Sequence, residues 1–309
     1  THHASSAASD VYKRQMSAKA QSRAAVIQTL RGADLYDALV VGGGIHGAAL
    51  GQLLALNGFK VALLEKADYA SATSSRSSKM AHGGLRYLEF FDFAQVREGV
   101  KAREALFGMA PHLVQPCEFL IPVHSYFERI KYKLGLSAYD LFHRLPQRRH
   151  RWLAASDLGQ SSSACQPPTR HGCFSYWDGI LDDARLTVET VLAARTSGAH
   201  CLNYAEVNNL ERDSGGIYNA YWHDRVSGCD EQLRTRTVIN CTGPWAASFT
   251  ERAGYTARTG LCHSRGTHVL FSHKWDGPAL FLPLVGQARY YFVWPHFAGT
   301  LVGTTEQRV

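Results

Sequence analysis

The sequence predicts an α/β fold with a parallel sheet in its N-terminal part and an antiparallel sheet in its C-terminal part. Three observations favour this fold. An apolar, β-branched run over residues 36–41 ends in a glycine-rich turn, and an Ala/Leu-rich helical stretch follows through Leu56. A second apolar run over residues 60–64 completes a strand, helix, strand order. From His268 onward, short aromatic and β-branched runs recur at regular spacing, which is typical of antiparallel strands.

The composition limits the class of protein without choosing its partner. The chain has 309 residues, of which 45% are hydrophobic, so it is long enough for one large domain or two ordinary ones. The net charge of +7 would suit nucleic acid, anionic lipid or a phosphorylated substrate. No nucleic acid is expected as a partner, because the basic residues form no recognised binding motif.

The cysteines indicate the redox environment. All seven are scattered, with no C-x-x-C pair and no histidine cluster at zinc spacing. They predict free thiols in a reducing compartment, hence a cytoplasmic location, and no metal site. The most apolar stretch, residues 38–59, contains several glycines and three polar side chains, so no membrane span is expected there.

Residues 1–33 are expected to be a non-native or disordered tail followed by a short helix. The first 15 residues are small and polar and precede Met16, which is a candidate native start. A disordered native tail is the alternative. The helix is predicted over residues 16–31.

The glycine-rich turn reads Gly42-x-Gly44-x-x-Gly47 and lies between the first strand and its helix. Gly42 permits a tight turn, Gly44 lets the backbone approach a pyrophosphate, and Gly47 lets the helix pack closely on the strand. The N-terminus of the helix would face the phosphates. Glu65 ends the second strand roughly 20 residues further on, where an acid commonly binds a ribose hydroxyl. The alternative is a tight turn without a ligand and a Glu65 on the surface.

The identity of the dinucleotide depends on the residues after Glu65. An acid at this position suits an unphosphorylated ribose, which belongs to NAD or to the adenosine half of FAD. Residues 71–89, SATSSRSSKMAHGGLRYLE, form a long hydroxyl-rich loop that would be a poor continuation of a simple nicotinamide-binding domain. The sequence therefore favours FAD.

The same loop resembles the S-S-x-S-S/T-K-x-x-H-G-G-x-R-Y-L-E signature of FAD-dependent sn-glycerol-3-phosphate dehydrogenases. The resemblance spans residue 34 to the last residues and continues at residues 109–113, 176, 182–186, 240–245, 266–268 and 303–305. It implies a glutathione-reductase-like fold of the D-amino-acid-oxidase type, with an FAD-binding Rossmann domain and an interleaved antiparallel-sheet substrate domain. The expected domains are residues 34–100 with 181–254 for FAD, and residues 101–180 with 255–309 for an incomplete substrate domain.

The resemblance also implies roles for single residues in this loop. The phosphate and ribityl parts of FAD would be held by Thr73, Ser74, Ser75 and Lys79, and the isoalloxazine ring would lie against His82, Gly83 and Gly84. His82 would accept the proton of the substrate C2 hydroxyl, because an imidazole titrates near the working pH. A purely structural histidine is the alternative. Arg86 would bind the substrate through its planar guanidinium, and Tyr87 would contact substrate unless it packs in the core.

Two further cofactor contacts are implied later in the chain. Val207 would touch the adenosine end through its backbone. Thr242 and Gly243 follow a predicted strand over residues 236–242 and would approach the pyrophosphate, with Gly243 removing an obstructing side chain. An ordinary strand-to-helix turn is the alternative.

The implied function is oxidation of sn-glycerol 3-phosphate to dihydroxyacetone phosphate, with electrons passed from FAD to a quinone. The alternatives are an oxidase that passes them to oxygen, a related amine or hydroxy-acid oxidoreductase, and a non-catalytic flavin-binding fragment. The family's later G-V-R-P and G-G-K-x-T-T-Y-R motifs do not occur in this chain. Because Arg86 alone would hold the substrate phosphate loosely, the chain is expected to turn over poorly without them.

Residues 128–152 combine positive charge with apolar side chains. The segment holds two acidic and seven basic residues, the latter being Arg129, Lys131, Lys133, Arg144, Arg148, Arg149 and Arg151. Interleaved with them are Ile130, Leu134, Leu136, Leu141, Phe142 and Leu145. This pattern predicts peripheral contact with anionic lipid on the inner face of the cytoplasmic membrane. A solvated helix that covers the substrate domain is the alternative.

Overall fold

The computed structural model describes residues 22–142, 148–158, 171–257, 260–284 and 290–309. Contacts between Cα atoms divide the chain into two compact units, Thr1–Arg76 with Ala184–Leu261, and Ser77–Asp183 with Cys262–Val309. The predicted boundaries at residues 100–101, 180–181 and 254–255 differ from this division, most of all at the first. The reason is that residues 77–100 pair and pack with strands of the second unit.

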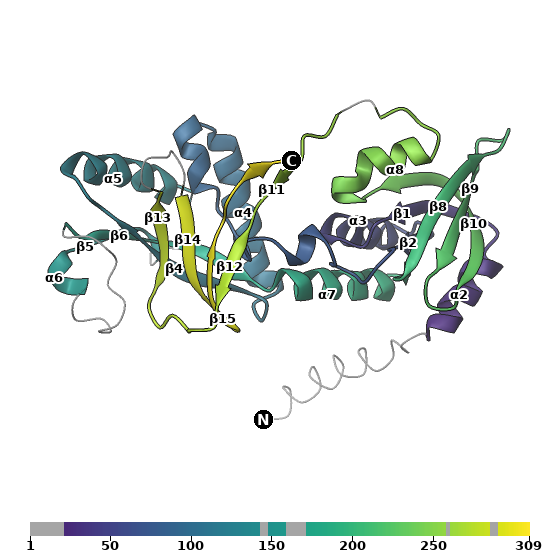
Figure 1. The fold of residues 1–309 in the computed structure, drawn as a ribbon, viewed down its shortest axis with the longest axis horizontal. Helices are drawn as coiled ribbons and strands as arrows, with labels where there is room; N and C mark the ends of the chain where they lie inside the picture. Colours follow the sequence, from purple (N-terminus) through teal and green to yellow (C-terminus); the bar gives the residue numbers. More distant parts are fainter. Residues whose placement is uncertain (1–21, 143–147, 159–170, 258–259, 285–289) are drawn as a thin grey trace, which may run out of the picture. The chain divides into compact units, whose positions relative to one another are not determined.

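The first unit is an α/β sandwich. It contains α2 (Arg23–Gly32), β1 (Tyr36–Val41), α3 (Ile45–Leu56), β2 (Val61–Leu64), η1 (Thr73–Ser75), α7 (Asp183–Thr196), β7 (His200–Leu202), β8 (Ala205–Arg212), β9 (Tyr218–Asp224), β10 (Cys229–Asn240), η4 (Gly243–Trp245) and α8 (Ala246–Arg252). Its sheet has the strand order β7-β2-β1-β10-β9-β8 (Figure 1). Because β1 is parallel to β2 and to β10, the predicted strand, helix, strand order is confirmed.

Alternation along β1 explains why helices cover both faces of this sheet. Leu39 and Val41 pack in one apolar cluster with residues of α2. Val40 points to the opposite face and packs in another cluster with residues of α3 and α7. A strand that is buried on both faces reads as a continuous apolar run, which is how residues 36–41 appear in the sequence.

Strand β10 is longer than predicted, because it begins at Cys229 rather than near residue 236. Its first half carries exposed polar side chains and pairs in antiparallel fashion with β9, which in turn pairs with β8. Polar, glycine-containing turns around residues 214–216 and 227–228 connect these three strands. The first half of β10 is therefore held by backbone hydrogen bonds to β9, and its side chains show no hydrophobic pattern that would predict a strand.

The second unit is built on a larger, mostly antiparallel sheet. It contains β3 (Met80–Ala81), η2 (Leu85–Phe90), α4 (Phe93–Met109), β4 (Val114–Pro122), α5 (Tyr126–Asp140), β5 (Arg151–Leu153), α6 (Ala155–Leu158), β6 (Cys173–Leu181), β11 (Ser264–Arg265), β12 (His268–Phe271), β13 (Ala279–Pro283), β14 (Tyr290–His296), β15 (Gly299–Gly303) and β16 (Gln307–Arg308). The strand order is β12-β15-β14-β13-β4-β6-β3, with β5 paired to β6. The antiparallel sheet predicted from His268 onward is confirmed, although β13 joins β4 in parallel.

Helices α4 and α5 lie on one face of this second sheet. Val96 and Val100 of α4 pack in the same apolar cluster as Leu136 and Tyr139 of α5. The cluster also includes Phe119 and other inward side chains of β4 and β6. Within the ranges given above, no helix is both long and apolar enough to cross a bilayer, and the six cysteines found there are free thiols.

Candidate cofactor and active-site residues

The glycine turn of the first unit leaves no room for side chains. At Gly42, φ is +113°, a conformation that glycine adopts without strain. A Cβ on Gly47 would lie 1.9 Å from the carbonyl oxygen of Gly42, and one on Gly44 would lie 3.0 Å from the hydroxyl of Ser74. The first turn of α3 therefore packs directly on the end of β1, with its N-terminal amides beside the turn.

Glu65 follows β2 and fixes the glycine turn. Its Oε2 accepts a hydrogen bond from the backbone N–H of Gly43 at 2.6 Å, and its Oε1 accepts one from Ala67 at 2.8 Å. Each carboxylate oxygen has a further lone pair, so these bonds leave acceptor capacity for a ribose hydroxyl. The predicted acid and the predicted turn thus lie together.

Of the hydroxyl residues that follow, Ser74 contacts the N-terminus of α3. Ser74 lies in η1, and its Oγ accepts a hydrogen bond from the backbone N–H of Ile45 at 2.9 Å. It therefore satisfies one of the amides that the first turn of a helix leaves unpaired. Thr73 lies in the same turn, whereas Ser75 donates its hydroxyl locally to Ala72 at 3.3 Å.

The end of β10 lies beside the glycine turn, because the backbone N–H of Cys241 donates to Val41 at 2.8 Å. Thr242 donates both its N–H and its hydroxyl to the side chain of Asn240. Gly243 begins η4 with a φ of +60°, and a Cβ there would meet no atom within 4 Å. The glycine is needed for the backbone conformation, whereas packing within the protein would tolerate a side chain.

Val207 has a buried side chain in β8. The strand starts at Ala205, whose N–H donates to the carbonyl oxygen of Glu65 at 2.8 Å. The first unit thus brings together the predicted glycines, Glu65, Ser74, the end of β10 and the start of β8.

Lys79 belongs to the second unit and is held by an acid. Its ammonium forms an ion pair with Asp183, the first residue of α7, and Ser77 donates its hydroxyl to the same carboxylate at 2.7 Å. Lys79 also has a φ of +55°, a backbone conformation that residues other than glycine rarely adopt. The predicted cofactor ligand therefore anchors the loop that precedes β3.

His82 lies directly after β3, and 43% of its side chain is exposed. Its Nδ1 is 3.4 Å from Oδ2 of Asp178, and its ring lies 5.2 Å from that of Phe292. Gly83 is required by packing, since a Cβ there would lie 1.8 Å from the hydroxyl oxygen of Tyr139. Gly84 has a φ of +81° and directly precedes η2.

Behind His82 lies a buried group of charged and polar side chains. Arg103 of α4 and Asp178 of β6 are each 1% exposed and form an ion pair at 2.9 Å. The same Arg103 nitrogen donates to the hydroxyl of Tyr139 at 2.9 Å. Burial alone would raise the pKa of Asp178, but the hydrogen bonds and charges of His82 and Arg103 outweigh it, so this pKa is lowered. The carboxyl group is therefore ionised.

Sequence reasoning missed Arg103, Tyr139 and Asp178. One signal was available, because Asp178 is the charged residue within the largely apolar and aromatic run of residues 173–181. Arg103 gave no comparable signal within the polar sequence of α4.

The predicted substrate residues lie in η2. Tyr87 is 47% exposed. Arg86 belongs to the same turn, but its side chain lies outside the described part of the structure, as do residues 1–21, which include the predicted tail and the beginning of the predicted helix. The later part of that helix is present as α2. Arg144 and Leu145 of the predicted lipid-binding segment also fall outside it.

Comparisons with known proteins agree with this arrangement. The family model described as FAD dependent oxidoreductase matches residues 37–309. Over 294 residues the chain is 36% identical to a glycerol-3-phosphate dehydrogenase of Synechocystis, covering 88% of this chain and 52% of that protein. It is also 35% identical to D-erythritol 1-phosphate dehydrogenase of Brucella abortus over 277 residues, covering 87% and 54% respectively.

Solved structures show the same fold. The glycerol-3-phosphate dehydrogenase from Bacillus halodurans, complexed with FAD, aligns with a TM-score of 0.72 at 24% identity and covers 94% of this chain and 51% of its own. L-alpha-glycerophosphate oxidase from Mycoplasma pneumoniae, with FAD bound, gives 0.68 at 17% identity, with 89% and 72% covered. The chain spans about half the length of the curated relatives it matches.

Proposed function

Because the chain belongs to the family of FAD-dependent oxidoreductases, we propose that it provides the FAD-binding and proton-accepting part of a sugar-alcohol phosphate dehydrogenase. The proposed reaction oxidises sn-glycerol 3-phosphate to dihydroxyacetone phosphate. The observation that supports it most directly is a partly exposed His82 whose ring is backed by the buried carboxylate of Asp178.

The residues present fit the adenosine diphosphate half of FAD. Side chains at Gly42 and Gly47 would collide with backbone atoms, and one at Gly44 would press on the hydroxyl of Ser74, so the backbone of the turn is left bare for a pyrophosphate. Glu65 lies beside that turn with acceptor capacity for a ribose. When bound, FAD supplies the acceptor for the hydride that leaves C2 of the substrate.

In this proposal His82 takes the proton of the C2 hydroxyl while the hydride leaves the same carbon, so that the alcohol becomes a ketone. Arg86 binds the substrate phosphate, which a planar guanidinium can contact with two parallel hydrogen bonds. Because one relative is named for D-erythritol 1-phosphate, anaerobic flavin reduction should be measured with both phosphates. In a protein extended to the length of its curated relatives, reduction by neither phosphate would overturn the proposal, and faster reduction by the erythritol phosphate would reassign the substrate.

FAD is expected to bind in preference to NAD, and Glu65→Ala is expected to weaken FAD binding by roughly 10-fold or more. The substitution removes the ribose acceptor and leaves the N–H groups of Gly43 and Ala67 without their partner. Equilibrium dialysis with each dinucleotide measures both effects. Glu206→Ala is the matched control, because Glu206 pairs with Arg225 on the surface of the same unit. Tight NAD binding with FAD left free would refute the cofactor assignment.

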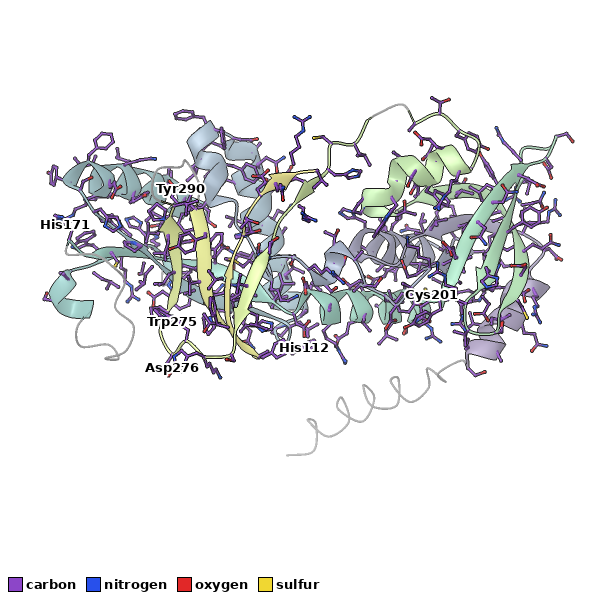
Figure 2. The ribbon with its side chains drawn as sticks, viewed as in Figure 1. His112, His171, Cys201, Trp275, Asp276 and Tyr290 are labelled. Carbon is purple, nitrogen blue, oxygen red and sulfur yellow. The ribbon has the colours of Figure 1, made fainter. Side chains whose placement is uncertain are left out.

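A half-open apolar pocket in the second unit supports a quinone as the electron acceptor. Leu88, Tyr132, Gly135 and Tyr290 are among its lining residues, and its cavity volume is about 80 Å³. Figure 2 shows Tyr290 at the beginning of β14, next to α5. Dioxygen needs no apolar lining, whereas an apolar lining suits the flat ring of a quinone.

The pocket is connected to His82 by aromatic rings. Tyr290 stacks on Phe281 at 4.5 Å between ring centroids, Phe281 lies 4.9 Å from Phe292, and Phe292 lies 5.2 Å from His82. Lys131 is the cationic residue among those that line the pocket, and it could donate to a quinone carbonyl.

Gly135→Leu is expected to lower the affinity for menadione by roughly 10-fold, because the new side chain would fill the pocket. A Cβ at Gly135 meets no atom within 4 Å, so the helix itself should accept the change. Gly108→Leu is the matched control, since Gly108 lies in α4 with equal freedom. Menadione titration and quinone-dependent turnover would be measured for both. Equal affinity in the two variants would remove the pocket from electron transfer.

The predicted lipid-binding segment is divided in the structure between α5 and β5. Leu136 faces the core and Phe142 packs against it. Arg129 stacks on Trp152, and Arg148 and Arg151 pair with acids. What remains outward is an apolar row on α5, at helical spacing, made of Tyr126, Phe127, Ile130 and Leu134, and continued by Leu141 directly after the helix. Because exposed Lys131 and Lys133 accompany this row, we propose that it contacts an anionic membrane surface from the cytoplasmic side.

Phe127→Glu with Leu134→Glu is expected to abolish co-sedimentation with anionic vesicles, because it places charge where apolar contact with lipid is proposed. The two side chains are 77% and 67% exposed, so folding should be unaffected. Leu192→Glu, at an exposed position on α7, serves as the control. The unchanged protein should lose binding as salt rises. Sedimentation that is indifferent to both anionic lipid and salt would contradict the proposal.

A further inference from the structure

We infer that Asp178 is a positioning residue that holds His82 in the tautomer with hydrogen on Nδ1, so that Nε2 is the atom that accepts the substrate proton. This inference rests on the function proposed above. The observation that supports it is that the buried carboxylate of Asp178 lies beside the Nδ1 edge of the partly exposed imidazole of His82.

The carboxylate of Asp178 is fixed in orientation by its Oδ1. That oxygen accepts hydrogen bonds from the backbone N–H of Gly83 at 2.9 Å, from Gly179 at 3.1 Å and from the guanidinium of Arg103 at 2.9 Å. Its Oδ2 is then directed at Nδ1 of His82, 3.4 Å away. A separation of this size is common for catalytic hydrogen bonds before substrate binds.

Asp178 therefore contacts both the backbone of Gly83 and the ring of His82. Gly83, whose N–H donates to Asp178, directly follows His82 in the chain. The carboxylate thus limits where the imidazole can lie and which of its nitrogens bears hydrogen. The opposite edge of the ring, with Nε2, is the edge left for a substrate hydroxyl.

The neighbours of Asp178 keep it charged. Arg103 faces it from α4, Tyr139 from α5, Tyr176 from β6 and Cys117 from β4, whereas Glu104 pairs with Arg103. Burial raises the pKa of Tyr139 and Tyr176, and it raises the pKa of Cys117 to about 11, so these three groups are neutral near pH 7. Arg103 is then the cation that offsets the buried carboxylate, and an ionised Asp178 can accept from Nδ1 but cannot donate to it.

The first test is the tautomer itself, which needs neither substrate nor turnover. Nitrogen NMR of the full chain with labelled histidine distinguishes a protonated from an unprotonated ring nitrogen, and His82→Gln identifies the signals. Nδ1 is expected to carry the hydrogen when His82 is neutral, and Asp178→Asn is expected to shift the population toward hydrogen on Nε2. Hydrogen on Nε2 in the unchanged protein would overturn the inference, even if Asp178→Asn failed to fold.

The second test separates positioning from structural support. In a protein extended to the length of its curated relatives, Asp178→Asn should slow anaerobic flavin reduction by roughly 10²-fold and move the acidic limb of its pH profile to lower pH. Added to His82→Ala, the same change should cause no further loss. Tyr139→Phe, which removes a hydrogen-bond partner of Arg103, should leave the pH profile unchanged. If the two substitutions slow flavin reduction additively, or if the acidic limb of the pH profile does not move, Asp178 has only a structural role. If the unchanged extended protein shows no flavin reduction, the proposed function is refuted instead.

Discussion

Replacing His82 by alanine is expected to slow flavin reduction by sn-glycerol 3-phosphate by roughly 10²-fold or more, with little effect on the substrate concentration required. The imidazole is proposed to take the hydroxyl proton, and alanine offers no base in its place. The measurement is anaerobic flavin bleaching in a protein extended to the length of the curated relatives. Arg86→Ala should have the opposite signature, chiefly raising the substrate requirement.

His223→Ala is the matched control for this prediction. His223 also pairs with a carboxylate, its Nδ1 lying 2.7 Å from Asp230, but it belongs to the hairpin of the first unit. The control should bleach at the original rate. An unchanged rate in His82→Ala would remove this histidine from proton transfer.

Gly47→Ala is expected to abolish FAD binding and to lower the melting temperature. Its Cβ would lie 1.9 Å from the carbonyl oxygen of Gly42, and backbone atoms cannot move aside as the end of a side chain can. The first turn of α3 would have to shift away from the glycine turn that is proposed to hold the pyrophosphate. Flavin absorbance of the purified protein, together with thermal unfolding with and without added FAD, measures both effects.

Gly51→Ala lies one turn further along α3 and is the control. A Cβ there would meet only the side-chain Cδ1 of Leu63 at 3.3 Å, and alanine favours a helix over glycine by about 1 kcal/mol. This variant should bind FAD and unfold at a similar or higher temperature. Full FAD binding by Gly47→Ala would show that the close approach is dispensable.

The parts of the structure that sequence predicted well are those specified by neighbouring residues. The turn from β1 to α3 depends on Gly42 and Gly47, which lie within one short stretch, and the strand and helix around it have clear hydrophobic periodicity. The antiparallel strands after His268 are likewise marked by local composition.

The parts that sequence did not reveal depend on distant partners. Arg103 and Asp178 are 75 positions apart, and no periodicity relates a polar residue on α4 to an acid on β6. The first domain boundary differs for a similar reason, since β3 belongs to the second sheet through pairing with Ile180 and Gly179. Sequence also did not show that packing requires Gly83, where a Cβ would meet Tyr139 and Arg103.

Because β3 is short, insertions or deletions near it would displace His82. Only Met80 and Ala81 pair with β6, and His82 comes directly after them. Successive residues of a strand point to opposite faces, so a shift of one position would turn the imidazole to the other side of the sheet. A Cβ on Gly179 would lie 3.0 Å from both the Cβ and the carbonyl oxygen of Ala81, so the pairing also has little lateral freedom. Length changes between Lys79 and His82 would therefore be selected against more strongly than most substitutions there.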